Sequence, residues 1–161
     1  MVNVVVIYDS RTGATEKMAK AVAEGASSVK GVEVELNKVG TRFDVCLIDL
    51  AVAVILGSPT HYGSVTLEMR ALLESLNDLK NLKKINFSGK IGGVFGSYGW
   101  DGGWVVDKLV ADMKGLGISV VEPKVSAADK GGGFGVRIGE EDLKKCRELG
   151  RAVAEKVSKR A

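Results

Sequence analysis

The hydrophobic positions along the chain follow two alternating periods. Val2–Tyr8 is a continuous, largely β-branched apolar run, which is typical of a strand buried on both faces of a parallel sheet. Between Thr15 and Val29 the apolar positions recur every three or four residues, which is the period of one helix face. This alternation of apolar runs and helical periods repeats along the chain. It predicts strands at residues 2–8, 32–39, 52–56, 90–95 and 118–121, and helices at residues 15–29, 43–50, 66–82, 104–116 and 140–158.

Strands that alternate with helices pair in parallel, because right-handed crossover connections return each strand to the same direction. The sequence therefore predicts an α/β fold, namely a doubly wound, five-stranded parallel sheet in the order 2-1-3-4-5 with helices on both faces. No repeat or low-complexity linker interrupts the alternation. Residues 1–161 are therefore expected to form a single domain.

Composition and charge narrow the class of protein. Hydrophobic residues make up 45% of the chain and charged residues 27%, as in soluble globular proteins. The net charge of +3 is spread along the chain without a basic run, which argues against nucleic-acid binding. No apolar stretch is long enough to cross a membrane, the first residues lack a signal-peptide pattern, and the two cysteines lie far apart. These features favour a cytoplasmic protein.

The polar and glycine-rich loops indicate where a ligand binds. In an open parallel sheet, ligands bind beyond the carboxyl ends of the strands, where the strand order reverses. In the predicted order this place lies between strands one and three, so the loops after strands one, three and four should surround a ligand. These loops, residues 9–15, 58–63 and 97–103, are also the ones rich in hydroxyl, glycine or aromatic residues.

The first loop has the composition of a phosphate site. Ser10, Thr12 and Thr15 supply hydroxyl groups, and Gly13 permits close approach of the backbone. The loop leads into a helix, whose first backbone N–H groups lack partners and favour an anion. The alternative is a simple helix cap, which requires one hydroxyl rather than three.

The other two loops carry flat aromatic side chains. Tyr62, Tyr98 and Trp100 have the right chemistry to stack on an aromatic ligand, and neighbouring glycines leave backbone amides free to meet its edge. The alternative is that these aromatic residues pack on the core at turns. Beside a phosphate site, the set favours a flat heteroaromatic ligand that carries one phosphate.

The three loops resemble those of flavodoxins and flavodoxin-like domains, and the resemblance covers nearly the whole chain. Ser10-x-Thr12-Gly13-x-Thr15-Glu16 is similar to the FMN phosphate loop of that family, with Ala14 where asparagine is frequent. The other two loops look most like the flavodoxin domain of flavodiiron (A-type) proteins, here as a free-standing short-chain form. They read Gly57-Ser58-Pro59-Thr60-x-x-Gly63 and Phe95-Gly96-Ser97-Tyr98-Gly99-Trp100-x-Gly102-Gly103.

The resemblance implies an FMN-binding, flavodoxin-like electron-transfer protein that shuttles electrons between redox protein partners. The alternative is an FMN-dependent NAD(P)H:quinone oxidoreductase. The slightly basic balance points to acidic partners, such as ferredoxin- or rubredoxin-like proteins. The resemblance implies no catalytic residue and no metal, and assigns FMN to Ser10, Arg11, Thr12, Gly13, Ala14, Thr15, Ser58, Pro59, Thr60, His61, Tyr62, Gly63, Ser97, Tyr98, Gly99, Trp100, Gly102 and Gly103.

Two features stay open at this point. His61, the single histidine, is either a proton relay or edge contact for the flavin or a solvent-facing turn residue. The glycine-rich segment Lys130–Gly135 is either a flexible surface loop or a mobile lid near the site.

Other nucleotide and enzyme folds fit the sequence less well. A phosphoaspartate switch needs an aspartate at the end of strand three, where Gly57-Ser58-Pro59 stands instead. A hydrolase elbow needs Gly-x-Ser-x-Gly, but Phe95 occupies the first position of the nearest match. A dinucleotide fold needs Gly-x-Gly-x-x-Gly after strand one, and the first loop lacks it.

Overall fold

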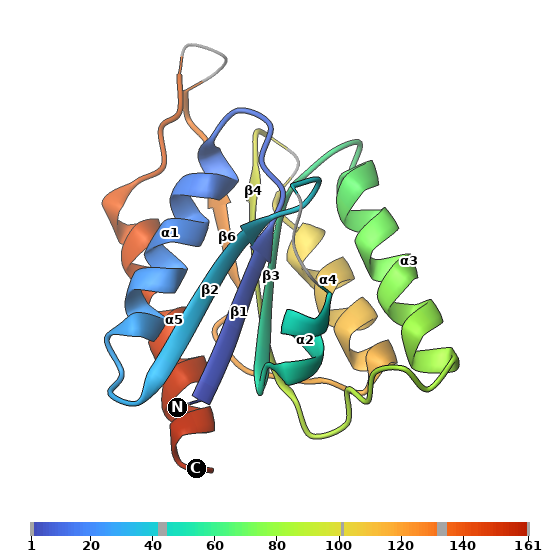
Figure 1. Ribbon diagram of the computed structural model, residues 1–161. Coiled ribbons are helices and arrows are strands. Elements are labelled where there is room, and N and C mark those ends of the chain that lie inside the picture. Colours follow the sequence, from blue (N-terminus) through green and yellow to red (C-terminus); the bar gives the residue numbers. More distant parts are fainter. Residues whose placement is uncertain (1, 42–44, 101, 132–134, 161) are drawn as a thin grey trace.

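The computed structural model describes residues 2–41, 45–100, 102–131 and 135–160. Strands and helices alternate along the chain (Figure 1). In chain order the elements are β1 (Val2–Tyr8), α1 (Ala14–Ser27), β2 (Val32–Lys38), α2 (Cys46–Leu50), β3 (Ala53–Pro59), α3 (Leu67–Asn81), β4 (Ile91–Tyr98), α4 (Val105–Leu116), β5 (Ser119–Val120), β6 (Val125–Ala128) and α5 (Glu140–Ser158).

The strands form a parallel sheet in the order β2-β1-β3-β4-β5, which confirms the predicted topology. β1 lies between β2 and β3, so that Val6 pairs with Leu36 on one side and with Ile55 on the other. The strand order reverses at β1 and β3. The carboxyl ends of these strands and of β4 therefore meet at one edge of the sheet.

The fifth strand is more complex than the sequence predicted. The predicted strand at residues 118–121 is reduced to β5 (Ser119–Val120), and a second segment, β6 (Val125–Ala128), pairs with β4 farther along. Between them lies Pro123, which has no N–H group to donate to a strand ladder. The chain therefore follows β4 in two separate steps, first beside Ile91 and then beside Phe95.

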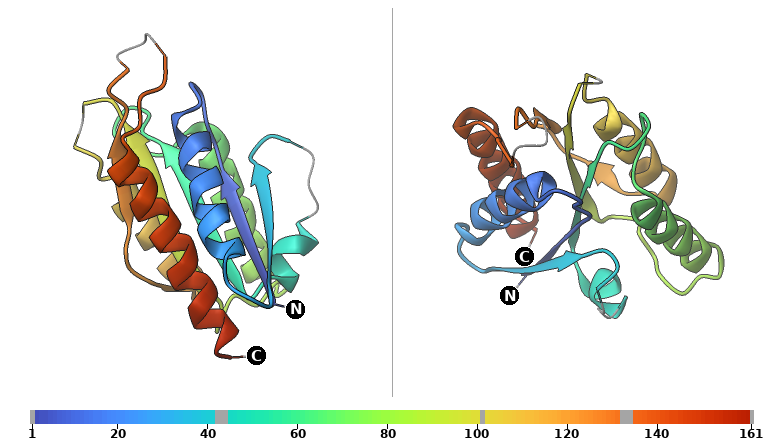
Figure 2. Two further views of the ribbon diagram at one scale, coloured as in Figure 1. Left: turned by 90° about the vertical axis from the view of Figure 1, so that its left-hand side faces the viewer. Right: turned by 90° about the horizontal axis from the view of Figure 1, so that it is seen from above.

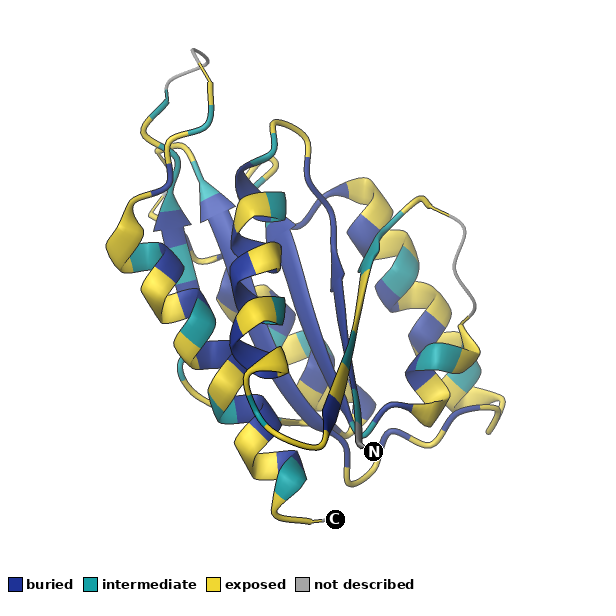
Figure 3. Cartoon of the chain, turned by 60° about the vertical axis from the view of Figure 1, so that its left-hand side comes forward, coloured by how far each residue is buried: buried dark blue, intermediate teal, exposed yellow. Residues whose placement is uncertain are grey.

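Two hydrophobic cores lie on opposite faces of the sheet, as the alternation of side chains along a strand requires. Val4 and Val6 of β1 belong to the core beneath α1 and α5, whereas Val5 and Ile7 belong to the core beneath α2, α3 and α4. Figure 2 shows the two helix layers on either side of the sheet. In Figure 3 the central strands β1, β3 and β4 are mostly buried, whereas the edge strand β2 and the outer helix faces carry exposed residues.

The helices agree with the prediction except at their ends. α5 has the predicted bounds, and α1, α3 and α4 differ from theirs by one or two residues. α2 begins at Cys46, and the predicted start of this helix at Phe43 lies outside the described residues. Among the described helices, none has both the length and the apolar character that a membrane crossing requires.

Candidate functional site

The loops after β1, β3 and β4 come together at the carboxyl edge of the sheet. The N–H group of Asp9 donates to the carbonyl oxygen of Gly57 over 3.0 Å, and that of Thr60 donates to the carbonyl oxygen of Ser97 over 2.9 Å. These bonds continue the strand pairing into the loops. The predicted ligand loops are thus adjacent in space.

The first loop presents open backbone donors. Gly13 precedes α1 with φ of +105°, a left-handed conformation that favours glycine. The first backbone bond of the helix runs from the N–H of Lys17 to the carbonyl of Gly13. Within the described part of the chain, the N–H groups of Ala14 and Thr15 have no backbone acceptor, as expected at a helix start, and are available to an anion.

Hydrogen bonds hold two hydroxyl groups of this loop in place. Ser10 Oγ accepts bonds from the backbone N–H of Gly13 at 3.1 Å and of Glu16 at 3.2 Å. The buried Thr15 Oγ1 lies 2.7 Å from Ser97 Oγ, which joins the first loop to the end of β4. Thr12 is exposed and lines the adjacent cavity.

Two acidic residues near this loop are drawn away from it. Glu16, in the first turn of α1, accepts a 3.0 Å bond from the hydroxyl of Tyr8. Burial, followed by this bond to Glu16, raises the pKa of the Tyr8 phenol, so that Tyr8 remains a donor. Glu68 forms an ion pair with Arg11, whose Nε also lies 3.8 Å from an oxygen of Asp9. Much of the Arg11 charge is therefore balanced by carboxylates.

A buried carboxylate supports the first loop from below, and the sequence analysis missed it. Asp9 accepts bonds from the N–H of Ser10 at 2.9 Å and from the hydroxyl of Thr66 at 2.5 Å. The same Thr66 hydroxyl caps α3 by accepting from Met69 N, and the N–H of Thr66 donates to Ser58 Oγ. The position of Asp9 directly after β1 was the available signal.

Two neighbouring cavities open between the loops. One, of about 240 Å³, is lined by Arg11, Thr12 and Ala14 of the first loop together with Pro59, Thr60, His61, Ser97, Tyr98, Gly99 and Asp129. The other, of about 370 Å³, is lined by Thr60, His61, Tyr62, Gly63, Gly99 and Trp100. They share Thr60, His61 and Gly99, so that together they extend from the helix start of α1 to Tyr62 and Trp100.

The two predicted stacking residues at the far cavity are unusually exposed. The relative exposure of Tyr62 is 101% and that of Trp100 is 98%, although large aromatic side chains are normally at least partly covered. His61 is also exposed, and its ring contacts Tyr62 edge to face, with 5.6 Å between the ring centres. A flat ligand in this cavity would cover apolar surface that is otherwise in water.

Some predicted site residues do not line either cavity, namely Ser10, Gly13, Thr15, Ser58, Gly102 and Gly103. Ser58 is fully buried, donates to the carbonyl of Pro59 and accepts from Thr66, so its hydroxyl serves the loop rather than the cavity. Gly102 and Gly103 lie against Trp104, Ser126 and the ring of Tyr98, with positive φ angles. These two glycines shape the turn between β4 and α4.

The segment after β6 lies against the first loop. Asp129 Oδ1 accepts from the N–H groups of Gly131 and Arg137, and Lys130 N donates to the carbonyl of Arg137. A Cβ atom on Gly13 would lie 3.4 Å from Cγ2 of Val136, which places this stem over the helix start of α1. The tip at residues 132–134 lies outside the described residues, and its role stays open.

Sequence comparison identifies the family. A protein-family model described as "Flavodoxin" matches residues 6–150. The chain belongs to the flavodoxin family. It is 37% identical over 173 residues to a flavodoxin of Aquifex aeolicus, covering 98% of this chain and 88% of the relative. A Methanosarcina barkeri protein named NAD(P)H dehydrogenase (quinone) is 33% identical over 126 residues, covering 62% of this chain and 60% of the relative.

Solved structures give the same result. A flavodoxin from the domain Archaea superposes with a TM-score of 0.82 at 30% identity and covers 98% of this chain and 99% of its own. The rubredoxin oxygen:oxidoreductase from Desulfovibrio gigas superposes with a TM-score of 0.83 at 28% identity, covering 98% of this chain but 36% of that protein. The flavodiiron protein from Giardia intestinalis gives a TM-score of 0.79 at 26% identity and is likewise covered over 36%.

The predicted resemblance to flavodoxins and to flavodiiron cores is thus confirmed. Proteins of this family bind FMN and transfer electrons. The site described above fits that cofactor, because open N–H groups at the start of α1 suit a phosphate and the far cavity suits a flat ring. A Cβ on Gly63 or Gly99 would meet nothing within 4 Å, so these backbones are open to a ligand.

Proposed function

We propose that this protein is a flavodoxin-type electron carrier that binds FMN in the two joined cavities and exchanges electrons with other redox proteins. One observation carries the proposal. The unpaired backbone N–H groups at the start of α1 lie at one end of two cavities that share lining residues, and the exposed Tyr62 and Trp100 lie at the other end. Bound FMN would supply reversible uptake of one or two electrons. The chain would supply binding, orientation and partial exclusion of water.

The proposed roles follow from the geometry of each loop. Ser10, the backbone N–H groups of Ala14 and Thr15, and the hydroxyls of Thr12 and Thr15 would hold the phosphate. The turn from Pro59 to Gly63 and the turn from Ser97 to Trp100 would enclose the ring system. Arg11 would contribute little to the phosphate, because Glu68 and Asp9 already balance its charge.

The first test is FMN affinity, measured by quenching of flavin fluorescence on addition of the purified FMN-free protein. Removing a hydroxyl that bonds a phosphate costs about 1.5 kcal/mol or more, so Ser10→Ala and Thr15→Val should each raise Kd roughly tenfold. Thr41→Val is the matched control, because Thr41 is exposed and bonds the carbonyl of Lys38. Equal affinity in all variants would reduce the first loop to a helix cap.

A second function, FMN-dependent NAD(P)H:quinone oxidoreduction, is favoured by the quinone dehydrogenase relative. The carrier has the stronger support, since the Aquifex and archaeal flavodoxins match over nearly the whole chain and the quinone enzyme over 62% of it. Steady oxidation of NADH or NADPH with a soluble quinone would establish the enzyme. Electron exchange with a redox protein, without such turnover, would establish the carrier.

The partner of the carrier is proposed to be a small redox protein with an acidic surface. Relatives of this chain are redox proteins, and the name of one of them includes rubredoxin. The net charge of +3 supports attraction to an acidic partner. Residues 1–161 are proposed to form one FMN-binding domain, and a cytoplasmic location stays a prediction.

A further inference from the structure

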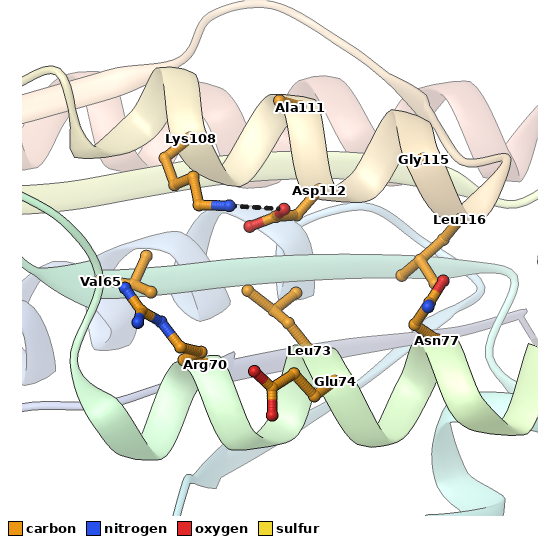
Figure 4. Close-up of a pocket in the computed structure, with 10 residues that line it drawn as sticks. All are labelled: Val65, Arg70, Leu73, Glu74, Asn77, Lys108, Ala111, Asp112, Gly115 and Leu116. Atoms are coloured by element: carbon orange, nitrogen blue, oxygen red, sulfur yellow. Dashed lines mark hydrogen bonds and ion pairs between the residues drawn. The ribbon is translucent and has the colours of Figure 1, made fainter.

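A groove of about 500 Å³ separates α3 from α4, away from the two flavin cavities (Figure 4). Its floor is formed by Val65, Leu73 and Leu116, which are buried apolar residues. Its rims are formed by one face of each helix, with Ala111 and Gly115 keeping the α4 side low. A Cβ atom on Gly115 would meet nothing within 4 Å, so the groove is open at this point.

The charged residues of α3 and α4 that border the groove occupy equivalent positions along their helices. Arg70 is the fourth residue of α3 and Lys108 the fourth residue of α4, and both lie at the Val65 end of the groove (Figure 4). Glu74 and Asp112 are each the eighth residue, one turn farther along. The groove therefore has a cationic end beside Val65 and an acidic middle.

Helix stability does not account for this arrangement. A cation four residues before an anion is the weaker orientation on a helix, since it opposes the macrodipole, and both helices carry it. Lys108 forms a 3.0 Å ion pair with Asp112. Among the residues that the structure describes, Arg70 has no carboxylate within ion-pair distance. Its guanidinium group is left available to an anionic group.

The cationic end faces the flavin site. Val65 follows the His61–Ser64 turn, whose His61, Tyr62 and Gly63 line the far cavity, and the first turns of α3 and α4 lie at the same edge of the sheet. Two further apolar residues are exposed at these helix starts, Leu67 at 72% and Trp104 at 55%. Exposed apolar surface beside a charged groove is typical of a protein contact site.

We propose that this groove is a docking site for the acidic redox partner of the carrier. An aspartate or glutamate side chain of the partner pairs with Arg70, and a neighbouring aliphatic side chain lies over the exposed Ala111 and Gly115. The partner is thereby anchored beside the exposed edge of the flavin site. This inference rests on the proposed function, because it names the surface that receives the partner.

The test is an NMR titration of the ¹⁵N-labelled, FMN-loaded protein with an acidic rubredoxin in which zinc replaces iron. Zinc makes this probe redox-inert, so that binding is measured without electron transfer. Chemical shift changes should cluster at residues 65–77 and 108–116. Loss of a pair of complementary charges should weaken binding roughly tenfold in the double variant Arg70→Gln/Lys108→Gln, with the loss fading at high salt.

Two further variants separate docking in the groove from general attraction. Lys144→Gln/Arg151→Gln removes the same charge from exposed positions on α5 and should change Kd less than about twofold. Gly115→Leu fills the groove without altering charge and should weaken binding roughly tenfold if a side chain of the partner lies there.

Three results would overturn the docking site: equal weakening by the two charge variants, unchanged binding to Gly115→Leu, or no binding of the rubredoxin to the wild-type protein. The proposed function is judged separately, by uptake of FMN and by its reduction. A protein that carries reducible FMN but fails the titration would retain its proposed function and lose this docking site.

Discussion

The two helix pairs that cover the sheet are packed in opposite ways. α1 and α5 lie so close that a Cβ atom on Gly25 would stand 2.0 Å from the carbonyl oxygen of Arg147, and one on Gly150 would stand 1.9 Å from that of Val22. On the other face, α3 and α4 leave the groove described above, where Gly115 faces open space. Figure 2 shows both pairs on their respective sides of the sheet.

The difference shows that glycines within helices serve different structural roles. Gly25 and Gly150 are required by the close approach of two backbones, whereas Gly115 keeps a surface hollow. Glycine costs roughly 0.5–1 kcal/mol relative to alanine within a helix. On the α1–α5 side the close packing offsets this cost. On the α3–α4 side no neighbour lies where a side chain of residue 115 would stand, although Lys80 of α3 donates to the carbonyl oxygen of Gly115, so no close approach of backbones offsets the cost.

The largest expected effect on stability is at the close contact between α1 and α5, called the tight side below. Gly150→Ala should lower the free energy of unfolding by about 3 kcal/mol, because the new methyl group forces α1 and α5 apart. Urea unfolding followed by circular dichroism measures this loss. Gly25→Ala should behave alike. A loss below about 1 kcal/mol in both variants would mean that the helices separate at little cost, and that the contrast between the two pairs is weaker than the distances indicate.

The next effect concerns the support of α3. Thr66→Val removes the cap of α3 and the hydrogen bond that the Thr66 hydroxyl donates to Asp9. It should lower the free energy of unfolding by about 2 kcal/mol. Thr66→Ser keeps the hydroxyl and should restore most of this loss in the same urea experiment. If serine and valine were equally destabilising, the methyl group of Thr66 rather than its hydrogen bonds would be responsible.

A pH effect is expected at the α5 face of the tight side. Burial raises the pKa of the Cys146 thiol from 9.0 to about 12. Because the folded pKa is the higher one, the stabilisation is complete below pH 9 and is lost as the pH rises toward 12, by up to about 1.4 kcal/mol per pH unit. Unfolding measured between pH 8.5 and 10.5 should therefore show a steeper decline for the wild type than for Cys146→Ala.

The other groups that titrate in this range are common to the wild type and Cys146→Ala, so the difference between their slopes reports on the Cys146 thiol. Equal slopes for the wild type and Cys146→Ala would show that the thiol ionises without unfolding, and hence that water reaches the α1–α5 core.

The smallest effect has the opposite sign. Gly115→Ala should raise the free energy of unfolding by about 0.5–1 kcal/mol, because alanine is the better helix former and its methyl group meets no neighbour. The same urea measurements detect this gain. A loss of stability would mean that α4 approaches α3 more closely in solution than the groove implies.

Sequence patterns predicted strands and helices well where they carry a strong period. The apolar run of β1 and the amphipathic face of α5 gave correct bounds, because burial on two faces or on one leaves a clear trace in the sequence. β6 was missed, since its four residues, Val125–Ala128, are too few to show a period and become a strand only by pairing with β4. The residues at which β6 begins and ends are decided by pairing with β4, which lies far away in the sequence.

The candidate site divides in the same way. The predicted strand order correctly placed the loops after strands one, three and four at one edge of the sheet, because strand order fixes where loops meet. Composition did not reveal that Ser58 points inward, that Arg11 is paired with Glu68, or that Asp9 supports the loop. Each of these depends on a contact with an element far along the chain.

The sequence by itself determined the fold class, the strand order, the edge of the sheet where the three loops meet, and the family to which the chain belongs. These properties are local, since they follow from the spacing of apolar residues and from short runs of loop residues. Only the tertiary structure decided how closely the helices approach each other, which polar side chains are occupied by one another, and where a groove remains. Those outcomes depend on distances between backbones, because a change of a few ångströms decides whether a methyl group fits beside Gly150 or Gly115.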